Sequence, residues 1–158
     1  MRRRRRKRDF ELRPTQPEEM SVLVRTIIRS VLPIALIYGF YIISYGHLTP
    51  GGGFQGGMIL VGAVVTFYLA YGYNILLRFS DEGLELVEAG AILAFLALGL
   101  LGMLGRGFLD NLLRGGIPGS LLSGGYLPIL NFTVGLKVAA GTLFLIIVLL
   151  EALRKGED

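Results

Sequence analysis

The sequence contains no cysteine and only one histidine among its 158 residues. Without cysteine the chain can form no disulfide, ligate no iron–sulfur cluster and use no thiolate nucleophile. A single histidine cannot build a multi-histidine metal or haem site, and nothing resembles a phosphate-binding loop or a Ser/His/Asp arrangement. We therefore expect a chain that is not itself an enzyme, with no metal and no cofactor of its own.

Charged residues are scarce over long stretches of the sequence. Hydrophobic residues make up 53% and charged residues 18%, and the mean hydropathy is +0.60. A helix needs ~20 apolar residues to cross the hydrocarbon core of a bilayer. The pattern therefore predicts an all-α, polytopic protein of the cell membrane. Its four transmembrane helices are expected over Ile27–Gly46, Gly57–Leu77, Leu86–Gly105 and Ile129–Leu150.

The uneven distribution of basic residues predicts the orientation in the membrane. Ten of the 16 Lys and Arg residues lie within residues 1–29. Cytoplasmic segments of membrane proteins carry an excess of Lys and Arg. With both termini in the cytoplasm, only Arg106 and Arg114 lie on the outer side, and Lys137 lies within the membrane. We therefore expect cytoplasmic termini, with the loops over 46–57 and 106–128 outside.

The basic N-terminus is expected to be a separate part of the chain. It leads into a polar segment and not into a short apolar core, so no cleavable signal peptide is expected. The run Arg2–Arg8 adjoins a span and has no interleaved aromatic residues, which favours anionic lipid over nucleic acid as its ligand. The expected division is a basic cytoplasmic extension over 1–25, a four-helix membrane domain over 26–151 and a cytoplasmic tail over 152–158.

A glycine-rich segment joins the first two predicted spans, with the sequence GHLTPGGGFQGG over residues 46–57. Proline fixes one φ angle, and glycine adopts conformations that other residues resist. Closely spaced glycines also allow another backbone to approach within contact distance. The simplest interpretation is a tight hairpin packed between helices, with a structural loop formed by Pro50, Gly51, Gly52, Gly53, Gln55, Gly56 and Gly57.

The same string resembles the signature of the B subunit of Mrp-type multisubunit cation/proton antiporters, the MnhB family. This module also occurs in membrane-bound hydrogenase and sulfur-reducing complexes. The resemblance extends roughly over residues 25–150. It includes GMIL at 57–60, which opens the second span, and NFTVGLKV at 131–138 in the fourth.

This resemblance implies an accessory membrane subunit that helps form a Na⁺ or H⁺ passage and holds the module together. It also implies neighbouring subunits of the A, C, F and G types. Two alternatives remain open from the sequence. The module could belong to a redox-driven ion-pumping complex of the hydrogenase or sulfur reductase type. The chain could also be a structural scaffold without an ion path.

Lys137 is the sharpest candidate for a functional residue. An ammonium in hydrocarbon costs ~3 kcal/mol or more, and it typically marks an ion path or a paired charge. The alternative is that the long side chain reaches back toward the outer headgroups. Thr133, Ala140 and Gly141 share its helix face, and the family motif also places a lysine at this position.

Glu88, His47 and Thr49 are weaker candidates for the same passage. A carboxylate at a helix N-terminus is favoured by the helix dipole, so Glu88 is either structural or a cytoplasmic entry point for ions. We expect Glu88 and Lys137 near opposite membrane faces, too far apart to pair directly. An imidazole can change charge near neutral pH, and Thr49 offers an oxygen to a cation, but a cap over the helices is the favoured role.

Overall fold

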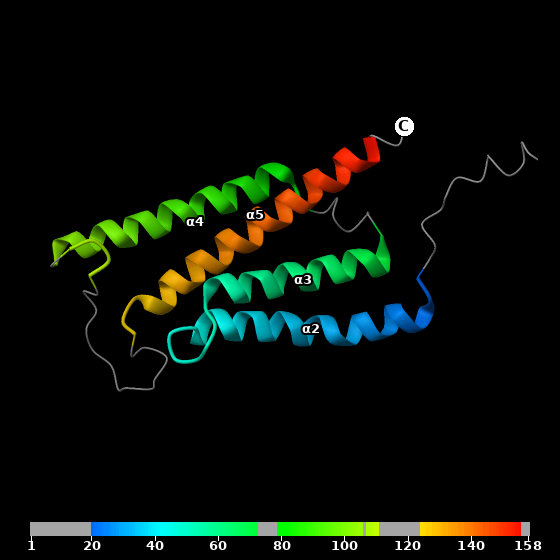
Figure 1. Ribbon diagram of the computed structural model, residues 1–158, viewed down its shortest axis with the longest axis horizontal. Coiled ribbons are helices and arrows are strands. Elements are labelled where there is room, and N and C mark those ends of the chain that lie inside the picture. Colours follow the sequence, from blue (N-terminus) through cyan, green and yellow to red (C-terminus); the bar gives the residue numbers. More distant parts are fainter. Residues whose placement is uncertain (1–19, 73–78, 106, 111–123, 156–158) are drawn as a thin grey trace, which may run out of the picture.

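The computed structural model describes residues 20–72, 79–105, 107–110 and 124–155. This part of the chain is all-helical. Four long helices, α2 (Val22–Tyr45), α3 (Gly53–Tyr71), α4 (Asp81–Leu101) and α5 (Leu127–Lys155), are accompanied by the short 3₁₀-helix η2 (Gly102–Leu104). Helix α4 packs on α5, α5 on α3, and α3 on α2 (Figure 1).

The four long helices confirm the prediction of four spans. Each is long and apolar enough to cross a membrane. At about 1.5 Å per residue they measure roughly 29 to 43 Å, which equals or exceeds the ~30 Å of a typical hydrocarbon core. The start of α2 and the end of α5 lie at the same end of the bundle (Figure 1). Which side of the membrane that end faces stays a prediction.

Two helices begin earlier than hydropathy predicts because serine caps them. The Ser21 side chain accepts a hydrogen bond from the Val24 N–H, and the Ser80 side chain accepts one from the Gly83 N–H. Such caps satisfy N–H groups that the first turn of a helix leaves without partners. Helix α4 therefore begins with Asp81, whose carboxylate suits a helix N-terminus. The end predicted for the second span lies outside the described residues.

The glycine-rich segment is helical over more of its length than predicted. The expectation that Gly53, Gln55 and Gly56 form a loop is wrong, because α3 begins at Gly53; Gly57, expected both in the loop and at the start of the second span, is helical. Of the seven residues expected in the loop, Pro50, Gly51 and Gly52 stay outside the helices. Gly51 and Gly52 have φ angles of 151° and 143°. Those values are accessible to glycine and strained for other residues, which explains the turn into α3.

The helical glycines of this segment form the junction of three helices. Gly56 lies against the Gly39 backbone of α2, and Gly57 lies against the Gly135 backbone of α5. A Cβ on either residue would come within 2.7 Å of the facing carbonyl oxygen. Small residues allow such close packing in lipid, where van der Waals contact drives helix association. The junction fixes α5 against α3 and leaves the opposite side of α5 to contact α4.

Candidate functional site

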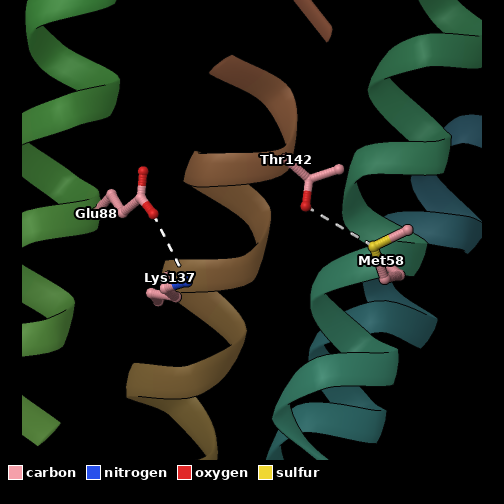
Figure 2. Close-up of polar contacts among 4 residues, drawn as sticks. All are labelled: Met58, Glu88, Lys137 and Thr142. Carbon is pink, nitrogen blue, oxygen red and sulfur yellow. Dashed lines mark hydrogen bonds and ion pairs between the residues drawn. The ribbon is translucent and has the colours of Figure 1, made fainter. Parts of the chain in front are cut away.

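Glu88 of α4 and Lys137 of α5 form an ion pair between the two helices. The Lys137 Nζ lies 3.6 Å from the Glu88 Oε1 (Figure 2). The expectation that these residues lie near opposite membrane faces is therefore wrong. Glu88 is about 10 Å along α4 from Asp81, and Lys137 is about 15 Å along α5 from Leu127, at about 1.5 Å per residue. Because α4 and α5 run antiparallel, these two distances are counted from opposite ends of the bundle. Both residues therefore lie between those ends, at a similar depth.

A glycine makes room for the carboxylate of this pair. The Glu88 carboxyl group packs over Gly141, one turn along α5 from Lys137. A Cβ at position 141 would lie 2.7 Å from the Glu88 Oε1. In the sequence, this space is indicated by a small residue four positions after an intramembrane lysine. The structure identifies the carboxylate that occupies it.

A cavity of about 200 Å³ adjoins the ion pair between α4 and α5. Its lining is almost entirely apolar apart from Lys137 and Thr133; the other lining residues are Ala91, Ile92, Phe95, Leu96 and Val134. Thr133 is 7% exposed, and its hydroxyl donates to the Leu130 carbonyl over 2.8 Å. Thr133 and Lys137 thus line the same cavity one turn apart on α5, and the Thr133 hydroxyl proton is engaged by the Leu130 carbonyl.

The side of α5 that faces α3 has a different character. The Thr142 hydroxyl lies 3.9 Å from the Met58 sulfur, and Figure 2 shows this contact on the far side of α5 from Lys137. Helix α5 therefore turns Lys137 toward α4, where it meets Glu88, and turns a closely packed face toward α3. Within the described ranges, no three His, Asp or Glu side chains come together as metal ligands would.

His47 and Thr49 lie apart from the ion pair, in the segment between α2 and α3. The Thr49 hydroxyl donates to the Tyr45 carbonyl over 3.1 Å, which secures the end of α2. The His47 ring packs against Gly124, and both of its nitrogens are buried without a hydrogen-bond partner among the described residues. This segment also contacts the Asn131 side chain, a residue that sequence reasoning passed over although it opens the NFTVGLKV motif.

Four apolar spans with an ion pair between two of them define the chain as a multi-pass membrane protein. Residues 23–144 match the family described as a domain related to the MnhB subunit of Na⁺/H⁺ antiporters. The chain belongs to this family, which confirms the resemblance drawn from the glycine-rich motif.

Two relatives are similar to this chain in sequence. An uncharacterized protein of Methanocaldococcus jannaschii is 39% identical over 142 residues, covering 82% of this chain and 53% of the relative. A Staphylococcus haemolyticus protein, by name an antiporter subunit mnhB2, is 34% identical over 93 residues, covering 58% of this chain and 66% of the relative.

The third relative is a solved structure, that of the membrane-bound sulfane sulfur reductase, an archaeal respiratory membrane complex. One of its chains is similar with a TM-score of 0.69 and 31% identity, over 84% of this chain and 59% of that chain. The protein described here thus spans about half the length of the archaeal relative and under two thirds of the chain in the solved structure.

Proposed function

We propose that this chain is a non-catalytic accessory subunit of a multisubunit cation/proton antiporter module. In this role Glu88 and Lys137 border a passage for Na⁺ or H⁺, and the rest of the chain holds the module together. The ion pair is the observation that carries the proposal, together with membership of the MnhB-related family. Subunits of the A, C, F and G types would be its neighbours.

The geometry of the pair suits ion passage better than rigid support. Its separation of 3.6 Å exceeds the ~2.7–2.9 Å of a tight charge-assisted hydrogen bond. The Lys137 side chain is 46% exposed and that of Glu88 29%. A loosely held pair can separate and exchange partners more readily than a tight one, whereas a purely structural pair gains most from close contact and burial.

The orientation proposed for this role has both termini in the cytoplasm. The basic extension over 1–25 would then contact anionic lipid, and the short tail over 152–158 would lie on the same side as the start of α2. The segment around His47 would face outward. The positive-inside rule supports this arrangement, because ten of the 16 Lys and Arg residues lie within residues 1–29.

The similarity to a sulfane sulfur reductase chain favours a second candidate function. In this alternative the same subunit serves a redox-driven ion-pumping complex, and its own contribution to ion passage is unchanged. Gentle purification through a tag on this chain, with mass spectrometry of the subunits recovered, separates the two. Nickel–iron or iron–sulfur subunits would identify the redox complex, whereas antiporter-type subunits alone would identify a secondary antiporter.

The test of ion passage is substitution within the assembled complex. We expect Lys137→Ala and Glu88→Gln each to lower cation/proton exchange in membrane vesicles, measured per assembled complex. Thr142→Val is the matched control, because it lies on the opposite side of α5 and does not contact the pair. Normal exchange in both pair variants with intact assembly would leave only the scaffold role.

A further inference from the structure

One face of the α4 and α5 pair leaves the ion pair partly uncovered. We define this α4–α5 face by Ile92, Leu96, Val134 and Lys137, which line the cavity beside the pair. Ile92 is 40% exposed and Leu96 45%, and the side chain of Lys137 is 46% exposed. The chain thus presents an apolar surface that includes a partly exposed lysine and a cavity.

Lipid is a poor cover for this face. An ammonium has three N–H donors, and among the described residues the Glu88 carboxylate is the acidic group that Lys137 meets. Hydrocarbon chains accept no hydrogen bonds, so an exposed charge at this depth stays costly. Because Lys137 is more exposed than Glu88, the open side of the pair is cationic.

We infer that a transmembrane helix of another subunit packs on the α4–α5 face and places an acidic side chain against Lys137. Its carboxylate supplies acceptors beyond the one that the described residues provide at Glu88, and it complements the exposed cation. The cavity of about 200 Å³ receives a neighbouring apolar side chain of the same helix, because well-packed helix interfaces leave few voids. The partner is therefore an apolar span with an Asp or Glu near its middle.

The inference takes from the proposed function only that the chain works inside a complex. Contact between two subunits and dependence of ion exchange on Lys137 are separate properties with separate readouts. Exchange unchanged by Lys137→Ala would remove the proposed ion passage and leave the contact standing. A missing contact would remove the inference and leave the exchange result as it is.

Photocrosslinking in the assembled complex tests the contact directly. A benzophenone-bearing residue replaces Leu96 on the α4–α5 face, and in a control it replaces Ile37, which is 70% exposed on α2. We expect the Leu96 probe to link to a span of another subunit that contains an acidic residue, and the Ile37 probe not to link to that span. Links from Leu96 to lipid alone, or to a span without Asp or Glu, would overturn the inference.

Charge exchange then tests whether the acidic residue meets Lys137. We expect Lys137→Glu to lower the Leu96 crosslink about tenfold, because a carboxylate at position 137 would repel the acidic side chain of the partner span. Replacing the identified acidic residue with lysine in the same complex should restore the crosslink. If Lys137→Glu prevents assembly, recovery of assembled complex by the reciprocal change is the readout. An unchanged crosslink in Lys137→Glu, or no recovery with the reciprocal change, overturns the inference.

Discussion

The carboxylate of Glu88 lies directly over Gly141, one turn of α5 beyond the lysine with which it pairs. This relationship links a backbone feature to the charge pair, because the missing Cβ is the space that the carboxylate occupies. Two residues of α5, Lys137 and Gly141, therefore set the position of one residue of α4. The site depends on the packing of α4 against α5 and not on the ion pair alone.

Gly141→Ala is expected to disturb the ion pair with little effect on the fold. The added methyl group would lie 2.7 Å from the Glu88 Oε1, and the flexible end of that side chain can move away. We expect lower cation/proton exchange per assembled complex and a thermal stability close to that of the wild type. Gly90→Ala is the control, since nothing lies within 4 Å of a Cβ at that α4 position. Equal exchange in both variants would contradict the prediction.

Gly57→Ala is expected to destabilise the protein, unlike the same change at Gly62 of α3. Its methyl group would lie 2.7 Å from the Gly135 carbonyl oxygen, where a rigid helix backbone cannot yield easily. Overpacking of this kind costs about 1–3 kcal/mol. At Gly62 of the same helix a Cβ meets nothing within 4 Å, so Gly62→Ala should be neutral or stabilising through helix propensity. Thermal unfolding of the purified complex compares the two variants.

The four spans could be predicted from hydropathy, but the contact between Glu88 and Lys137 could not. Depth in the membrane depends on where each helix begins, and the Ser80 cap starts α4 at Asp81, ahead of the apolar run. The glycine-rich motif identified the family correctly. The conformation of the motif itself was predicted only in part. Low helix propensity predicts a loop at Gly56 and Gly57, whereas backbone contacts with α2 and α5 hold both residues in a helix.

His47→Leu is expected to leave both stability and exchange near wild-type values. The two ring nitrogens are buried and have no hydrogen-bond partner among the described residues. Replacing an unpaired buried polar group with an apolar one of similar size is close to neutral or stabilising. We therefore expect a change of stability within about 1 kcal/mol, measured by thermal unfolding of the complex. A large loss would instead reveal a hydrogen-bond partner for His47 in the assembled complex.

Glu88→Gln combined with Lys137→Met should be better tolerated than Lys137→Met alone. Each single substitution leaves one charge without its partner at membrane depth, and that loss costs more than the pair contributes. Because both side chains are partly exposed on this chain, we expect single-variant losses of about 1–3 kcal/mol, below the range for fully buried pairs. The double variant should recover part of that loss while exchange stays low, since no titratable or cationic group remains at either position.

A double-mutant cycle on the thermal stability of the complex, with exchange measured in the same preparations, separates the two effects. Additive losses would show that the two residues do not depend on each other for stability.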